Sequence, residues 1–142
     1  MLGKLIVACT VMALCVTIHA IGIAGALQGL RRTRTSAQTF WSSLLLFIGL
    51  AVWIVLLHLS EIGVWAWAYV RAGALGDMKT ALYFSAVTYT TTGYGDIVLP
   101  VPWRLDAGVE ALTGILMCGW STGFFFAIVS RMFDAQPSAV RS

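Results

Sequence analysis

One short stretch of the chain has residue types suited to binding a dehydrated cation. Residues 90–96 read Thr-Thr-Thr-Gly-Tyr-Gly-Asp. A run of Thr and Gly allows the backbone to present stacked carbonyl oxygens, and such oxygens replace the water around a potassium ion. Gly93 and Gly95 have a physical reason to be glycine, because a residue without Cβ adopts a positive φ at low cost and lets adjacent carbonyls point the same way. The stretch therefore predicts an ion-coordinating loop.

The composition indicates that this loop belongs to an integral membrane protein. Of the 142 residues, 59% are hydrophobic and 11% are charged, and the mean hydropathy is +0.87. These values are too apolar for an ordinary soluble domain. The net charge is only +3 and the basic residues stand at the ends of apolar runs, so we expect no nucleic-acid partner. Cys9, Cys15 and Cys118 lack zinc-ligand spacing and are predicted to be reduced packing residues.

Three apolar runs are long enough to span a bilayer. Leu5 to Leu27 contains no charged residue, and as a helix it reaches about 34 Å, against a hydrocarbon core of about 30 Å. Phe40 to Val70 carries only Glu61 as a formal charge and is longer than one span requires. Ala107 to Ser130 is broken only by Glu110. Because the second run is longer than one span, its last residues are expected to emerge from the hydrocarbon core. Trp65, Trp67 and Tyr69 would then lie at the headgroups as an aromatic belt.

A shorter helix is predicted between the second and third runs. Asp77 is a candidate N-cap, and residues 80–91 then form about three helical turns, too few to cross a membrane. Pro100 and Pro102 bring the chain back toward the last span. Non-helical backbone at membrane depth is tolerated only where protein buries it or water lines it. A half-span helix followed by a re-entrant loop satisfies this condition.

The basic residues predict the orientation. Arg31, Arg32 and Arg34 separate the first two runs and Arg131 ends the third, so these ends are expected in the cytoplasm. The loop at 90–96 then faces outward, with the N-terminus outside and the C-terminus inside. A cleaved signal peptide is the alternative interpretation of the first run, although that run is longer than the usual apolar region of such peptides.

Residues 43–131 resemble the pore domain of potassium channels. The sequence Tyr83-Phe84-Ser85-Ala86-Val87-Thr88, followed by the loop, looks most like small bacterial ion-channel proteins. The resemblance implies that the filter carbonyls coordinate K+ as four identical chains surround one axis, because one chain supplies a quarter of each ring. It also implies that Tyr83 and Phe84 pack as a cuff around Tyr94. The ion-binding residues implied are Thr91 (also through its hydroxyl), Thr92, Gly93 and Tyr94, with Gly95 completing the loop and Val87, Asp96 and Glu110 supporting it.

Three features depart from the family pattern. Thr92 stands where Val, Ile or Leu is usual, which leaves open a cation channel that also conducts sodium. We favour a Val-shaped side chain behind the filter with a local hydrogen bond. Val87 replaces a glutamate found in some relatives and predicts different hydrogen bonding behind the filter. The first span is additional to the two helices of the family, and the sequence suggests no role for it.

The last span carries the predicted cavity and hinge. Four residues at steps of three, four and four share one helical face, which in the family lines the cavity below the filter: Ile115, Cys118, Thr122 and Phe126. Phe126 is the candidate constriction. Gly114 and Gly119 match hinge positions of the family, although close helix packing explains small residues equally well.

Ionisable residues within the spans are also candidate sites. Glu110 begins the last span and is expected to accept a hydrogen bond from the short helix or a neighbouring subunit, with gating or proton sensing as the alternative. His58 and Glu61 lie three apart on one face and either pair or reach the outer headgroups. His19 is expected to be a packed neutral imidazole.

The sequence thus predicts an all-α channel with three transmembrane helices plus a re-entrant helix and filter, in the cell inner (plasma) membrane. No catalytic set or phosphate-binding lysine accompanies the glycines, so we expect no enzyme activity and no cofactor besides the permeant ion. An accessory membrane subunit is the non-channel alternative. The predicted organisation is an N-terminal transmembrane helix at 1–28, a basic loop at 29–39, an outer helix at 40–70, the pore helix and filter at 77–102, an inner helix at 103–131 and a tail at 132–142.

Overall fold

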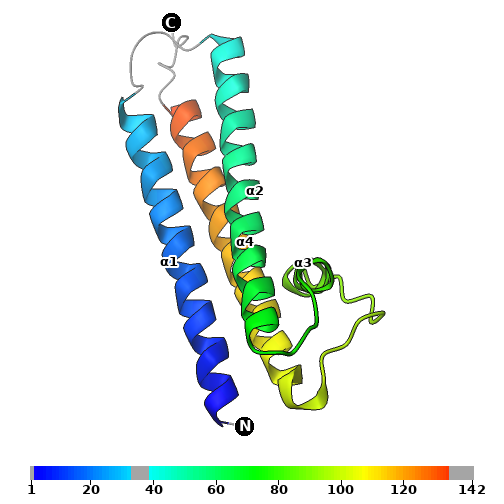
Figure 1. The fold of residues 1–142 in the computed structure, drawn as a ribbon. Helices are drawn as coiled ribbons and strands as arrows, with labels where there is room; N and C mark the ends of the chain where they lie inside the picture. The colour runs from blue at the N-terminus through cyan, green and yellow to red at the C-terminus, as the bar shows by residue number, and fades with distance from the viewer. Residues whose placement is uncertain (1, 33–38, 135–142) are drawn as a thin grey trace, which may run out of the picture.

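The computed structural model describes residues 2–32 and 39–134, and within them every regular element is helical. Figure 1 shows three long helices side by side and one short helix set to one side of them. The elements are α1 (Leu2–Arg32), α2 (Phe40–Arg71), α3 (Met78–Tyr89), the 3-10 turn η1 (Val101–Trp103) and α4 (Arg104–Asp134). This arrangement confirms the predicted all-α class.

The three long helices are also long and apolar enough to cross a membrane. The candidate spans are Gly3–Arg31, Phe40–Arg71 and Val101–Arg131. Each contains one of the apolar runs expected from the sequence and extends beyond it by a few residues. At about 1.5 Å per residue, each helix exceeds the thickness of the hydrocarbon core. The molecule is therefore an all-α membrane protein.

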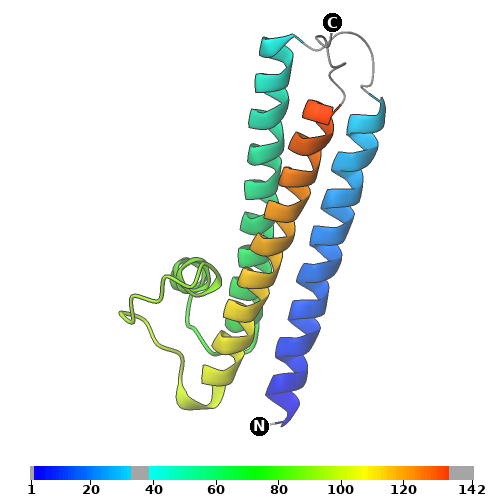
Figure 2. The same ribbon diagram turned by 180° about the vertical axis from the view of Figure 1, so that it is seen from behind.

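α1, for which the sequence suggested no role, packs along α2 and α4 (Figures 1 and 2). Cys15 is 0% exposed in this contact. The Trp53 indole on α2 donates its Nε1–H to the Gly22 carbonyl on α1, with N and O 3.1 Å apart. Near the other end of α1, Lys4 Nζ lies 3.8 Å from the centroid of the Trp103 ring, a cation–π contact. α1 therefore packs along its length against the other two long helices.

Side-chain and backbone caps define both ends of α2. The Thr39 hydroxyl caps its N-terminus by accepting a backbone N–H of the first turn. At the C-terminus, Gly73 has φ of +67°, and the N–H groups of Gly73 and Ala74 donate to the carbonyls of Val70 and Tyr69. This is a Schellman motif, which satisfies the last carbonyls of the helix and turns the chain toward α3.

The predicted aromatic belt at the end of α2 is wrong for two of its three residues. Trp65 and Tyr69 are only 1% and 2% exposed, whereas Trp67 is 57% exposed. Residues four apart share a helical face, so Trp65 and Tyr69 face the other helices together and pack with ring centroids 5.9 Å apart. Only Trp67 lies on the outer face, where a headgroup contact is available.

α3 is a short helix that crosses the direction of the bundle and is seen nearly end-on in Figure 1. It begins and ends two residues earlier than predicted, at 78 and 89 instead of 80 and 91. The predicted N-cap is confirmed: the N–H and the hydroxyl of Thr80 both donate to the Asp77 carboxylate, at 2.9 and 2.7 Å. These hydrogen bonds stabilise the ionised form and hold the pKa of Asp77 below its usual value.

α4 approaches the end of α3 closely at one glycine. A Cβ placed on Gly114 would lie 1.9 Å from the carbonyl oxygen of Tyr89, the last residue of α3. Gly119, by contrast, has no atom within 4 Å of such a Cβ. Of the two explanations left open by the sequence, close packing therefore accounts for Gly114.

Most of the predicted basic loop and tail lies outside the described residues. Arg34 falls within 33–38, and the tail after Asp134 is likewise not described. α1 ends and α2 begins at the same end of the bundle as the end of α4, while α3 lies toward the opposite end, near the N-terminus (Figure 1).

The close approach at Gly114 predicts an asymmetric effect of two alanine substitutions. Gly114→Ala should lower the thermal unfolding midpoint of the purified protein, because overpacking against backbone costs about 1–3 kcal/mol. Gly119→Ala, the matched control, should leave the midpoint unchanged or raise it, because alanine is about 1 kcal/mol better than glycine within a helix. Equal midpoints for the two variants would contradict the packing role of Gly114.

Candidate functional site

The ion-coordinating loop begins as a hydrogen-bonded continuation of α3. The N–H of Thr91 donates to the Thr88 carbonyl at 2.9 Å, and the N–H groups of Thr92 and Gly93 donate to the Val87 carbonyl at 2.9 and 3.2 Å. Thr91 occupies the position after the C-cap, where a Schellman motif requires a left-handed residue. The end of α3 therefore fixes the direction in which the loop leaves the helix.

The backbone then alternates in the sign of φ. Thr91, Gly93 and Gly95 have φ of +60°, +55° and +78°, and the intervening Thr92 and Tyr94 are not among the positive-φ residues. In such an alternation successive N–H groups point to one side of the chain, so the carbonyls point to the other. A positive φ is unusual for a β-branched residue such as Thr91 and costs about 1–3 kcal/mol, and strain of this kind concentrates at functional sites.

The carbonyls of the loop have no competing partner in the described part of the chain. The N–H groups of residues 91–93 donate to α3, whereas no N–H or hydroxyl within residues 2–32 and 39–134 donates to the carbonyls of residues 91–94. All residues from 90 to 96 are exposed, and Tyr94 is 72% exposed. The loop thus presents a row of free oxygens on the open side of a single chain.

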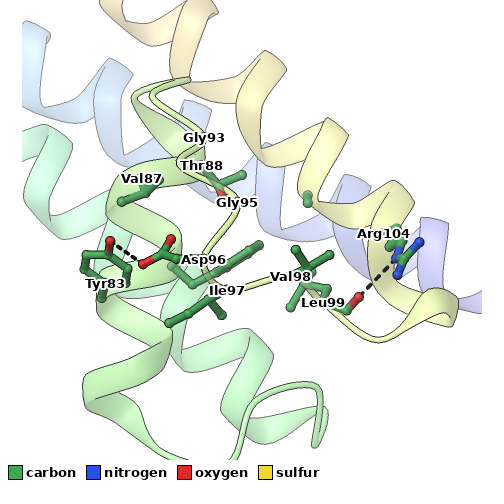
Figure 3. A pocket seen from close by; sticks show the side chains of 12 residues that line it. Tyr83, Val87, Thr88, Gly93, Gly95, Asp96, Ile97, Val98, Leu99 and Arg104 are labelled. Atoms are coloured by element: carbon green, nitrogen blue, oxygen red, sulfur yellow. Dashed lines mark hydrogen bonds between the residues drawn. The ribbon is translucent and has the colours of Figure 1, made fainter.

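Asp96 is held against α3 by a hydrogen bond behind the loop. Figure 3 shows the Tyr83 hydroxyl donating to Asp96 Oδ2, with the two oxygens 2.7 Å apart. Val87 lines the same pocket of about 300 Å³ and offers no polar group. The Arg104 side chain on α4 donates to the Leu99 carbonyl at 3.3 Å where the chain returns. The hydrogen bond between Tyr83 and Asp96 thus connects α3 to the loop. Val87 has no polar side-chain atom and makes no such hydrogen bond.

The predicted aromatic cuff is not assembled within one chain. Tyr83 faces Asp96, as described above. Phe84 is 6% exposed and packs edge-on against the Tyr69 ring of α2, with centroids 5.5 Å apart. Tyr94 projects from the loop and is largely exposed. Within the chain, Phe84 therefore anchors α3 to α2.

Thr92 makes a local hydrogen bond. The Thr90 hydroxyl donates to the Ala86 carbonyl on α3 at 2.7 Å, so the Thr92 hydroxyl donates to Thr90, with the two oxygens 2.9 Å apart. The Thr92 hydroxyl is therefore connected through Thr90 to α3 rather than left free.

Glu110 is 0% exposed, and its Oε2 accepts a hydrogen bond from the Tyr69 hydroxyl at 2.8 Å. Tyr69 belongs to α2, so this bond, which the sequence did not predict, joins α2 to α4. The Ser85 side chain of α3 also interacts with the Glu110 carboxyl group, as expected for a contact with the short helix. The same tyrosine packs on Phe84, which links the Glu110 contact to the pore helix.

Three of the four predicted cavity residues lie together. Cys118, Thr122 and Phe126 line one open groove of about 640 Å³ between α2 and α4, while Ile115 is exposed but lies outside it. The Thr122 hydroxyl donates to the Cys118 carbonyl one turn earlier. The opposite wall of the groove is formed by α2 and includes His58.

A buried polar cluster lies behind the end of α3, and the sequence analysis did not bring its members together. Of the two alternatives for His58 and Glu61, the structure has the pair: Glu61 is 0% exposed, and His58 Nδ1 lies 3.7 Å from its Oε2. His19 Nδ1 lies 2.8 Å from Glu61 Oε1, and the Tyr89 hydroxyl donates to Glu61 Oε2. His58 Nδ1 lies 3.0 Å from the Tyr89 oxygen. Ser121 Oγ lies 3.0 and 3.3 Å from the Nε2 atoms of His19 and His58.

This cluster contains one or more residues from each of α1, α2, α3 and α4. His19 is packed, as expected, since it is 0% exposed, and it also contacts the Glu61 carboxylate directly. The sequence did contain one signal for this cluster, because ionisable residues at membrane depth are rarely without partners. His19, His58 and Glu61 all lie within two long apolar runs. Tyr89 and Ser121 gave no such signal.

Three membrane-length helices, with a short helix and an exposed backbone loop to one side of them, are consistent with an all-α membrane channel. Residues 57–131, just over half of the chain, match the sequence model of a family described as "Ion channel". The chain belongs to this ion channel family. Comparisons with curated proteins and with solved structures gave no match.

The backbone of the loop predicts the effect of replacing Gly93. Gly93→Ala should abolish selective ion current in reconstituted protein, because a Cβ disfavours φ of +55° and the carbonyl row depends on that angle. Gly73→Ala is the matched control, since Gly73 has φ of +67° but lies outside the loop. It should lower stability and leave ion selectivity intact. Unchanged current in Gly93→Ala would show that this loop is not the filter.

Proposed function

We propose that the protein is a potassium-selective channel that lets K+ flow passively through a filter formed by Thr91, Thr92, Gly93, Tyr94 and Gly95. The observation that supports this most strongly is the alternation of φ over residues 91–95, with the N–H groups of residues 91–93 bonded to α3 and the carbonyls free. Carbonyl rings of this kind replace the hydration shell of K+.

The proposed assembly is a homotetramer. One chain supplies one quarter of each carbonyl ring, and the exposure of the whole loop in a single chain is the exposure expected of a surface that faces a symmetry axis. Four α3 helices would direct their negative C-terminal ends toward the axis and lower the cost of holding a cation there. An accessory subunit would instead complete its pore with other chains, so purification as a self-contained tetramer would oppose that alternative.

A channel that conducts both sodium and potassium is the second candidate, and Thr92 is the residue that motivates it. The hydrogen bond between the hydroxyls of Thr92 and Thr90 supports the selective alternative, because it engages the Thr92 side chain locally and leaves its carbonyl available. Selectivity then depends on backbone oxygens, as in the family.

The proposed orientation places the N-terminus outside the cell and the C-terminus in the cytoplasm of the inner (plasma) membrane. Arg31 ends one candidate span and Arg131 ends another, and α1 and α4 end on the same side of the bundle (Figure 1). Basic residues favour the cytoplasmic side. The filter loop, nearer the opposite end, would then enter from outside.

Ion substitution tests the selectivity. Protein reconstituted into bilayers should give reversal potentials close to the potassium equilibrium potential when potassium and sodium are exchanged across the membrane, because the carbonyl row is continuous. Size-exclusion chromatography with light scattering should give the mass of four chains. Comparable permeability to the two ions would favour the non-selective channel.

Thiol modification tests the pore-facing stripe. A membrane-impermeant thiol reagent applied from the cytoplasmic side should alter current through the open channel, because Cys118 is exposed in the groove with Thr122 and Phe126. Cys118→Ser should abolish the effect. Cys9→Ser is the control, since Cys9 is also exposed but lies on α1. If an open wild-type channel is indifferent to the reagent, Cys118 does not face the cavity and Phe126 is not its constriction.

A further inference from the structure

The cluster behind α3 has the donor atoms of a transition-metal site, a role separate from conduction. One ring nitrogen of His19, one of His58 and a carboxylate oxygen of Glu61 lie within 4.8 Å of one another. We propose that these three residues bind a divalent metal ion of the zinc class, with the Tyr89 oxygen at the fourth corner. Two imidazoles and a carboxylate are a common ligand set for Zn²⁺.

The distances suit this coordination. A tetrahedral zinc ion with bonds of about 2.0–2.1 Å holds neighbouring donor atoms about 3.3 Å apart. The separation between His19 Nδ1 and Glu61 Oε1 is 2.8 Å, and that between His58 Nδ1 and Glu61 Oε2 is 3.7 Å, so the two values bracket the required spacing. The Tyr89 oxygen touches both Glu61 and His58. The donor atoms of His19, His58 and Glu61 lie within 4.8 Å of one another, so side-chain adjustments would bring all three to the spacing of a bound ion.

Ser121 provides the second, independent observation. Its Oγ lies within hydrogen-bond distance of Nε2 on both histidines, while both Nδ1 atoms point toward Glu61 or Tyr89. When Nδ1 of each ring binds a metal, each Nε2 carries a proton, and the two lone pairs of one hydroxyl accept both. Ligating histidines in proteins usually donate their other N–H in this way.

Proton counting shows how the same atoms behave without a metal. The five contacts among His19, His58, Glu61, Tyr89 and Ser121 each need one proton. Two neutral imidazoles, a tyrosine and a serine around an ionised carboxylate supply only four. In one of the five contacts, both atoms then present a lone pair and no proton lies between them, unless the cluster binds an extra proton. A metal ion at the Nδ1 atoms removes that conflict, so the cluster requires a cation of some kind.

The surroundings of the cluster allow a cation to enter. Tyr89, the last residue of α3, reaches the cluster through its hydroxyl, which donates to Glu61. His19 and Glu61 are fully buried, whereas the His58 side chain is 17% exposed and lines the groove of about 640 Å³ between α2 and α4. A hydrated ion in that groove reaches His58 first. Once bound, the ion would join α1 and α2 to the residue directly before the filter.

Cobalt binding tests this site without reference to ion current. Full-length protein, freed of its affinity tag and of metal by chelation, should bind Co²⁺ with saturable visible d–d absorption of a tetrahedral site, and Zn²⁺ should displace it. His58→Gln and Glu61→Gln should each abolish the absorption. Ser121→Ala should retain it with affinity weaker by about 10–100-fold, the usual effect of removing a hydrogen bond behind a ligand.

Controls separate this site from other metal-binding groups and from the proposed function. Cys9→Ser and Cys118→Ser should bind Co²⁺ like the wild type, because neither thiol belongs to the site. If Glu61→Gln fails to fold, as judged by helical content and elution volume, His58→Gln and Ser121→Ala carry the test. Absence of Co²⁺ absorption in the wild type, or unchanged affinity in His58→Gln, would overturn the metal site and leave a proton as the bound cation. Neither result depends on whether the channel selects potassium.

Discussion

The C-terminal end of α3 is the point on which the rest of the structure depends. A helix leaves its last carbonyls without partners, and here the N–H groups of Thr91, Thr92 and Gly93 satisfy them. Because those N–H groups point back to the helix, the carbonyls that follow point away from it. One hydrogen-bonding requirement at a helix end thereby sets the direction of the whole carbonyl row.

Contacts with the long helices hold this end of α3 in place. Gly114 allows α4 to approach the Tyr89 carbonyl, while the Tyr89 hydroxyl donates to Glu61 between α1 and α2. Polar groups buried at membrane depth lack water as an alternative partner, so moving Tyr89 would leave several of them unsatisfied. α1 contributes His19 to this cluster and so has a structural role next to the end of α3.

Strain and exposure coincide in the loop. Thr91 adopts a positive φ that a β-branched residue avoids, and Tyr94 is 72% exposed although it is a large aromatic residue. The bond from Tyr83 to Asp96 and the Schellman motif hold this conformation from the α3 side. The opposite, carbonyl-bearing side of the loop is exposed in the single chain, which agrees with the proposed assembly around an axis.

The sequence by itself determined the features that depend on local chemistry. Apolar runs predicted the three long helices, Asp77 predicted the start of α3, and the glycines at 93 and 95 predicted positive φ. The tertiary structure alone decided which face of each helix is buried. Trp65 and Tyr69 lie inside because α1 and α4 cover their side of α2, and His19 meets Glu61 because α1 packs at one particular register. In an almost uniformly apolar helix, polarity does not distinguish the lipid-facing side from the packed side, so contacts between helices had to decide.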